Sequence, residues 1–110
     1  LDEIEPLADE IVITKTASGA FTGTPLDWTL RNMGIEHVFI CGFVTDECVE
    51  TTARAALDLG YSTKIISDAT ATYRAEDYEN MIAKFTGYGF TQTTAEVKQQ
   101  FDQMNKAAQA

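Results

Sequence analysis

Residues 37–67, HVFICGFVTDECVETTARAALDLGYSTKIIS, have the pattern of a strand, a helix and a second strand. The run 37–43 is almost continuously apolar, which is typical of a parallel strand buried on both faces and predicts that Cys41 belongs to the core. In the helical stretch that follows, one face carries the apolar residues Val49, Ala53, Ala56 and Leu57. Gly60 can end this helix in the left-handed conformation, and the run 62–67 predicts the next strand. A connection this short indicates a right-handed βαβ unit in a parallel sheet.

The same alternation of strands and helices continues on both sides of this unit. IVITK, residues 11–15, predicts another strand, and a short piece around residues 88–91 predicts a fourth. The remaining helices are expected at about 24–34, 75–85 and 95–108. Together these elements predict an α/β fold of three layers, a Rossmann-like parallel sheet with helices on both faces.

Three of the expected helices carry capping signals at their N-termini. Thr24 can cap the first of them, with a proline at the first helical position. Thr45 or Asp46 can cap the helix of the central unit, and Thr93 and Glu96 have the spacing of a capping box for the last helix. Each cap indicates where a helix begins, and therefore which residues lie in the loop before it.

The size of the chain limits how much of a sheet it can build. It has 110 residues, enough for one small domain, and 45% of them are hydrophobic. An all-parallel sheet needs helices on both faces and sheltered edges, whereas a sheet of three or four strands would expose an edge on at least one side. Residues 1–110 are therefore expected to form a single partial domain, completed by a missing segment or by another chain.

Charge and composition argue against several classes of function. The formal net charge of -9 disfavours binding to nucleic acid, which needs clustered lysine and arginine, and to an anionic membrane surface. No apolar run approaches the roughly 18–20 residues of a membrane span, and the acidic residues 1–10 do not resemble a signal peptide. Two cysteines seven positions apart are no disulfide framework, so a cytoplasmic location is expected. The common glycine-rich nucleotide motifs do not occur, and no cofactor is predicted.

Cys48 stands where a ligand could reach it. It lies five residues past Phe43, in the first turn of the following helix, and ligands of open α/β sheets bind outside the carboxyl ends of the strands. The free N–H groups and partial positive charge of a helix N-terminus favour a thiolate and can hold an oxyanion. Asp46 and Glu47 lie in the same turn and would oppose the thiolate. A nearby positive charge would favour the thiolate despite these two carboxylates.

Lys15 is the candidate for that positive charge. It ends the predicted strand 11–15, so it lies at the same carboxyl edge, ahead of the loop TASGAFTGT at 16–24. A lysine there could stabilise a thiolate or carry a proton. Two simpler interpretations remain open from the residues alone. Lys15 could mark the point where the strand emerges into water, and Cys48 could be a buried, inert cysteine.

Two motifs in the correct order carry a resemblance to a known family. The central one, G-x-x-T-x-x-C-V-x-x-T-A-x-x-A-x-x-x-G-Y, is matched by Gly42, Thr45, Cys48, Val49, Thr52, Ala53, Ala56, Gly60 and Tyr61. The upstream one, K-x-x-x-S-A-F-x-x-T-x-L, is nearly matched by Lys15, Ser18, Ala20, Phe21, Thr24 and Leu26, with Gly19 as an extra residue after the serine. Asp68 and Ala69 match a D-A pair after the next strand. Over most of residues 4–97 the chain resembles the isochorismatase-like cysteine hydrolases, which include nicotinamidases and several small-amide hydrolases.

The resemblance implies the chemistry of a cysteine hydrolase. It assigns Cys48 as the nucleophile and Lys15 as the cation beside it. It also implies a cis peptide bond between Phe43 and Val44, with the N–H groups of Val44 and Cys48 holding one oxygen. The implied reaction is hydrolysis of a small amide through a cysteine thioester, with hydrolysis of a vinyl ether, as in isochorismatase, as the alternative chemistry.

The resemblance extends only to the C-terminal half of the family's domain. The catalytic aspartate of the family lies on an earlier strand, and no aspartate of this chain occupies that motif. The metal ligands of nicotinamidase-type members belong to the same absent half, so no metal is predicted. Phe21 and Tyr73 are expected to line the pocket for a small-molecule substrate. The chain is expected to be a hydrolase completed by an N-terminal half or by homo-oligomerisation, or else a truncated half-domain that oligomerises without turnover.

Overall fold

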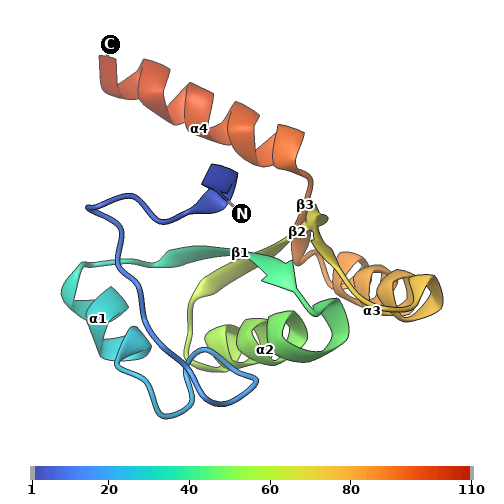
Figure 1. Ribbon diagram of the computed structural model, residues 1–110. Coiled ribbons are helices and arrows are strands. Elements are labelled where there is room, and N and C mark those ends of the chain that lie inside the picture. The colour runs from blue at the N-terminus through green and yellow to red at the C-terminus, as the bar shows by residue number, and fades with distance from the viewer. Residues whose placement is uncertain (1, 110) are drawn as a thin grey trace.

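The computed structural model describes residues 2–109, in which strands and helices alternate along the chain (Figure 1). The strands are β1 (His37–Phe43), β2 (Ser62–Ala71) and β3 (Thr91–Gln92). The α-helices are α1 (Leu26–Asn32), α2 (Glu50–Asp58), α3 (Ala75–Gly87) and α4 (Thr94–Gln109). Two short helical turns also form, the 3₁₀ turn η1 (Asp2–Ile4) and the π-helical turn η2 (Thr45–Val49). None of these helices has both the length and the apolar character that crossing a bilayer requires.

The three strands form one parallel sheet in the order β1-β2-β3. Figure 1 shows α4 on one side of this sheet, and α2 and α3 on the other. The predicted α/β fold, with a parallel sheet between helices, is therefore confirmed. β1 has its predicted bounds, β2 extends four residues beyond its predicted end, and β3 has only two residues.

The core lies between the sheet and the helices α2 and α3. It consists of five buried apolar side chains: Val49, Ala53, Ile65, Met81 and Phe85. Two of them, Val49 and Ala53, come from the predicted apolar face of the central unit. Phe85 is 1% exposed, and burial of a phenylalanine side chain contributes about 1.5–3 kcal/mol. This face of the sheet is well covered, and the cluster anchors the end of η2 and the start of α2.

β1 is an edge strand, which the sequence did not predict. Among the residues that the structure describes, β1 pairs only with β2, so one side of its backbone has no neighbouring strand. Phe43 is 68% exposed, and Cys41 is exposed as well. The prediction that Cys41 belongs to the core was wrong. A continuous apolar run indicates a strand made for burial, but it does not reveal whether one neighbouring strand or two are present.

The stretch 11–15, predicted to be a strand, forms none. It carries no strand pairing, and the side chains of Ile11 and Val12 are 59% and 69% exposed. A cavity of about 630 Å³ is lined by Ile11 from this side and by Val38 and Phe39 from β1. We call this cavity the edge groove. A β-strand needs a neighbouring strand with which its backbone forms hydrogen bonds. Residues 11–15 have no such neighbour, because the edge groove separates them from β1.

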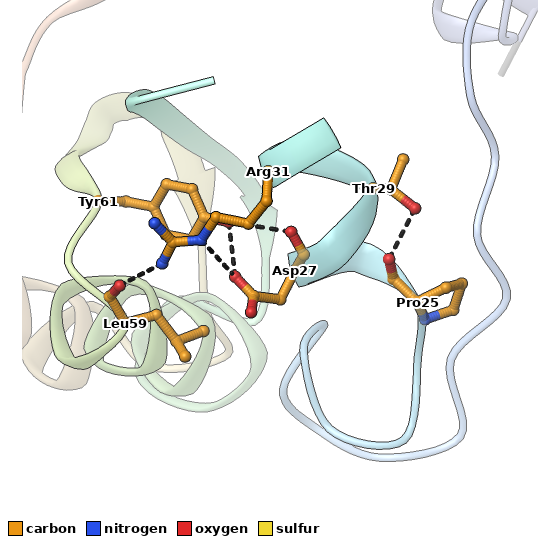
Figure 2. Close-up of polar contacts among 6 residues, drawn as sticks. All are labelled: Pro25, Asp27, Thr29, Arg31, Leu59 and Tyr61. Atoms are coloured by element: carbon orange, nitrogen blue, oxygen red, sulfur yellow. Dashed lines mark hydrogen bonds and ion pairs between the residues drawn. The ribbon is translucent and has the colours of Figure 1, made fainter. Parts of the chain in front are cut away.

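α1 is fastened at the amino end of β2, as Figure 2 shows. Arg31 pairs with Asp27 at 3.3 Å, donates to the carbonyl of Leu59, and places its guanidinium 4.4 Å from the centre of the Tyr61 ring. The Tyr61 hydroxyl donates to Asp27 Oδ1 at 2.6 Å. Burial and this hydrogen bond raise the pKa of Tyr61. The cluster lies where β2 begins, opposite to the carboxyl ends of the strands.

Two of the predicted helix starts differ from expectation. α1 begins at Leu26, one residue later than expected, and the Thr24 hydroxyl accepts from the Leu26 N–H at 3.3 Å. Thr45 and Asp46 do not cap α2. Their side chains instead form hydrogen bonds with threonines at the end of β2, across the sheet edge. Capping was predicted from neighbouring residues alone. In the fold, the side chains of Thr45 and Asp46 bind partners that are distant in sequence instead of the N–H groups of α2.

α4 begins at the predicted capping box. The Glu96 N–H donates to Thr93 Oγ1 at 3.2 Å. The Thr93 N–H donates to Glu96 Oε1 at 3.0 Å, and this bond to the carboxylate lowers the pKa of Glu96. Further along, the Phe101 ring meets Phe39 of β1 edge-on, with ring centres 5.5 Å apart. Val97 is buried, whereas Phe101 remains 45% exposed. The second face of the sheet is therefore only partly covered.

Candidate active site

The candidate site begins where the chain leaves the carboxyl end of β1. Gly42 has a φ of +112°, a conformation that residues with a Cβ rarely adopt, which explains glycine at this position. The Phe43–Val44 peptide bond is cis and lies where the resemblance places it. Directly after it, η2 carries Cys48 to the start of α2.

η2 is a π-helical turn rather than the regular helix start that the sequence predicted. The Val49 N–H donates to the Val44 carbonyl at 3.1 Å, five residues back, and the Glu47 N–H donates to the same carbonyl at 3.2 Å. Such wide turns are frequent at functional sites. The side chain of Cys48 is partly exposed in this turn, while its neighbour Val49 is buried in the core. The core thus anchors a turn that leaves the sulfur accessible.

Lys15 reaches Cys48 across 33 positions of sequence. Its Nζ lies 3.7 Å from Cys48 Sγ and also donates to the Ala17 carbonyl at 3.0 Å. The expectation that both residues meet at the carboxyl edge of the sheet is confirmed by this distance, and their catalytic roles remain predictions. Asp46, which could have opposed a thiolate, accepts a hydrogen bond from the Thr72 hydroxyl at 2.7 Å.

The loop after Lys15 is held against α2 at two points. The Ala20 N–H donates to Thr52 Oγ1 at 3.0 Å. Gly19 is buried against Thr51, and a Cβ added to it would lie 3.1 Å from the Thr51 methyl carbon. The extra glycine of the upstream motif therefore permits a close approach of the loop to α2. These contacts keep Lys15 near η2 and Cys48.

A cavity of about 370 Å³ opens beside the sulfur, and we call it the site cavity. It is lined by residues 39–43 of β1 and by Lys15, Ala20, Cys48, Val49 and Thr52. This volume is in the range of pockets for small molecules. The lining is mostly apolar, with the Lys15 ammonium and the thiols of Cys41 and Cys48 as its reactive groups. A small, largely uncharged substrate suits such a lining.

Two residues predicted to line the pocket lie elsewhere. The Phe21 ring stacks on Tyr61 with ring centres 5.9 Å apart, near the cluster that fastens α1. Tyr73 is 86% exposed. Neither residue is among those that line the site cavity. A role of either side chain in substrate binding has no support in this arrangement.

Two aspartates of the described residues have partners away from Lys15 and Cys48. Asp27 pairs with Arg31, and Asp68 accepts from the N–H and hydroxyl of Thr94, which lower its pKa. Within residues 2–109, no ion pair involving Lys15 is found. Nor do the described side chains include three or more histidines, cysteines or carboxylates grouped as metal ligands. The site, as these residues form it, consists of a thiol, an ammonium and a cavity.

Comparison with known proteins identifies the family. The family model of the isochorismatase domain matches residues 1–97. The chain belongs to the isochorismatase family. An uncharacterised family member from Bacillus subtilis is 40% identical over 92 residues, and the ureidoacrylate amidohydrolase of Caulobacter vibrioides is 34% identical over 107 residues. These matches cover 83% and 94% of this chain but 49% and 47% of the relatives. The chain spans about half the length of the curated relatives it matches.

Solved structures agree with this assignment. An isochorismatase-like hydrolase from Alkaliphilus metalliredigens matches with a TM-score of 0.87 and 30% identity, over 92% of this chain and 56% of that one. The nicotinamidase of Staphylococcus aureus matches with a TM-score of 0.65 and 39% identity, over 67% of this chain and 48% of that one. The resemblance predicted from the two motifs is confirmed. The family is one of hydrolases, and the relatives include enzymes of the amidohydrolase type.

Proposed function

We propose that this protein hydrolyses the C–N bond of a small amide, with Cys48 as the nucleophile. The observation that carries the proposal is the 3.7 Å contact between Lys15 Nζ and Cys48 Sγ at the wall of the site cavity. A cation at this distance favours the ionised sulfur, which is the form that attacks a carbonyl. The amidohydrolase and nicotinamidase among the relatives support an amide, rather than a vinyl ether, as the substrate.

The proposed reaction has two stages. The Cys48 sulfur attacks the amide carbonyl, a C–S bond forms, and the π electrons of the carbonyl move onto its oxygen. The N–H groups of Val44 and Cys48 are proposed to hold this oxyanion. The C–N bond then breaks, and the amine leaves with the proton that the thiol lost. Water attacks the resulting thioester and releases a carboxylic acid and the free cysteine.

The proton of the thiol needs an acceptor. We infer that this acceptor is a carboxylate from outside residues 1–110. The side chain of Asp46, two residues before the nucleophile, is already engaged by Thr72. Lys15 can favour the thiolate, but an ammonium cannot accept a proton. Residues 1–110 alone are therefore expected to have a reactive cysteine and little or no turnover.

We propose that the carboxylate is carried by a strand that lies in the edge groove. The groove is lined by residues 37–39 of β1, and the site cavity by residues 39–43, so the two follow one another along the free edge of the strand. On the other side, Ile11 and Ile13 line the groove and Lys15 lines the cavity. A strand laid there parallel to β1 would end beside Lys15 and Cys48.

Two sources of such a strand are proposed, an N-terminal half of the same polypeptide or a second copy of the chain in a homo-oligomer. Measuring activity and molecular mass together over a range of concentrations separates them. Activity that falls on dilution along with the mass indicates a homo-oligomer. Activity that does not depend on concentration indicates the same polypeptide.

The free Cys41 and Cys48 fit a protein that works in the reducing cytoplasm.

The proposed function is tested by turnover of a panel of small amides, with an enol ether included, in the protein completed by the strand that supplies the carboxylate. Cys48→Ser should abolish turnover, and Lys15→Ala should reduce it strongly. Lys98→Ala, which removes an exposed lysine of α4, is the matched control and should leave turnover unchanged. Iodoacetamide should label Cys48 faster than it labels a free thiol. Unchanged turnover in Cys48→Ser, or labelling no faster than that of a free thiol, would refute the proposal.

A further inference from the structure

The pairing of β1 with β2 is interrupted just before the turn η2. Ile40 lies opposite Ile65, but Gly42 lies opposite Thr70, so two steps along β1 match five steps along β2. Residues 66–69 of β2 thus face the single residue 41 of β1, and the three extra residues make β2 bulge. Bulges redirect side chains and are over-represented next to active sites. This one brings Thr70, rather than a residue of the regular register, to the level of Gly42.

Two helices hold the bulge in place. The Tyr78 hydroxyl of α3 donates to the Ser67 carbonyl at 2.5 Å. Asp68 accepts from the N–H and the hydroxyl of Thr94, at the start of α4, at 2.8 Å each. The bulge is therefore fixed from outside by side chains of α3 and α4. A fixed bulge can serve as a rigid support for what it contacts on its other side.

On that side, Thr70 near the end of β2 and Thr72 just after it contact the turn η2, which carries Cys48. The hydroxyls of Thr70 and Thr45 are 2.8 Å apart, and Thr45 is 0% exposed. The Thr72 hydroxyl donates to Asp46 Oδ1 at 2.7 Å. Thr45 and Asp46 directly precede Glu47 and Cys48 in η2. Both hydrogen bonds therefore fix the backbone on which the sulfur is carried.

The second of these bonds also restrains a charge. Asp46 is only two residues from Cys48, and a carboxylate that came close to the sulfur would disfavour its ionised form. With the Thr72 hydroxyl bound to it, the Asp46 carboxylate has a preferred position at the end of β2. Its release would leave the negative charge free to approach the thiol.

We propose that Thr70 and Thr72 are positioning residues for the Cys48 nucleophile, acting through Thr45 and Asp46. This inference rests on the proposed function of Cys48. The competing explanation is that the Thr45 hydroxyl, being buried, merely needs a partner. The two explanations differ when both hydroxyls are removed together, because replacing both partners by apolar groups of the same shape can leave stability nearly unchanged.

The test measures iodoacetamide labelling of Cys48 in the full protein, with glutathione added to each sample as the reference thiol. Peptide mapping by mass spectrometry distinguishes Cys48 from Cys41. Thr70→Val should slow labelling of Cys48 roughly tenfold relative to glutathione, the effect expected when one hydrogen bond of ordinary strength is lost. Thr72→Val should slow it as well, whereas Thr70→Ser should keep the rate of the wild type.

The decisive variant is the double replacement Thr45→Val with Thr70→Val. It should restore the unfolding midpoint towards that of the wild type while labelling of Cys48 remains slow. The matched control is Thr86→Val, which breaks a second pair of threonine hydroxyls, Thr86 with Thr91 at 2.8 Å, and should leave the rate unchanged.

The outcomes separate this inference from the proposed function. If Cys48 of the wild type labels no faster than a free thiol, the proposed function fails. If the wild type labels rapidly and Thr70→Val labels equally rapidly, only the positioning role fails. Recovery of rate and stability together in the double variant would also overturn it, because burial alone would then explain the pair. A slow double variant with recovered stability supports it.

Discussion

The two sides of β1 differ in how completely they are built. Towards β2, the strand has a hydrogen-bonded ladder, a bulge fixed by two helices, and a core in which Phe85 and Ile65 are almost fully buried. Towards residues 9–15 it has the edge groove and no strand partner among the described residues. The turn η2 with Cys48 is built on the complete side, whereas Lys15 belongs to the open side. The site therefore depends on two regions of unequal stability.

The largest expected effect concerns the core on the β2 side. Phe85→Ala should lower the free energy of unfolding by about 3–5 kcal/mol, because it leaves a cavity in a packed cluster. Ile11→Ala on the open side should change it by about 0.5 kcal/mol or less, because Ile11 is 59% exposed. Chemical denaturation of both variants checks the contrast. Similar losses for the two residues would mean that another segment covers residues 9–15 in solution.

Hydrogen exchange should show the same contrast without a substitution. Amides of β1 and β2 that pair with each other should exchange about a hundredfold more slowly than those of residues 11–15, since local stability varies widely within one fold. The measurement is amide exchange followed by mass spectrometry or NMR. Equal protection of residues 11–15 would indicate that a strand occupies the edge groove.

A smaller effect is expected where the two sides meet. Lys15→Ala should slow iodoacetamide labelling of Cys48 by about 3- to 10-fold, because the charge pair is partly screened by water. Lys15→Arg should retain part of the rate, since it keeps the charge but alters the geometry. The unfolding midpoint should stay the same in both variants, because Lys15 is exposed. An unaltered labelling rate in Lys15→Ala would show that the contact has no electrostatic role.

The smallest effect concerns pH and the bulge of β2. Hydrogen bonds from Thr94 lower the pKa of Asp68, so its carboxylate stabilises the folded state above its ordinary titration range near pH 4. This contribution is lost as the pH falls through the lowered pKa of the folded state. Asp68→Asn should make stability less dependent on pH below about 4, and Asp102→Asn, on the exposed side of α4, should not. Denaturation between pH 5 and 2 provides the measurement, and identical pH profiles of wild type and Asp68→Asn would contradict it.

Several features of the site follow from local sequence patterns. The βαβ unit, the bounds of β1, the placement of Cys48 after it and the capping box at Thr93 all depend on residues close together in sequence. A contact between Lys15 and Cys48 was predicted because the carboxyl ends of parallel strands share one edge, and it forms although residues 11–15 are not a strand. The motifs added the cis bond at Phe43–Val44, which no propensity would have suggested.

Other features could not be predicted in this way. Phe21 is part of the upstream motif, yet it packs on Tyr61, because the loop after Lys15 turns back along α2. Thr70 and Thr72 lie in or next to a β-branched run, where threonine is simply a good strand residue. The slipped register of β2 places Thr70 opposite Gly42, and Thr70 and the Thr72 that follows the strand then contact η2.

The sequence by itself determined the order and type of the elements from β1 onwards and the family to which the chain belongs. Hydrophobic periodicity, glycines and capping residues act over a few positions, so a short segment of chain is enough to specify a helix or a strand. The tertiary structure alone decided that β1 is an edge strand, that residues 11–15 stay unpaired, and that the β2 bulge holds η2. These depend on which strand lies beside which and in what register. Pairing between distant segments, rather than local propensity, sets both.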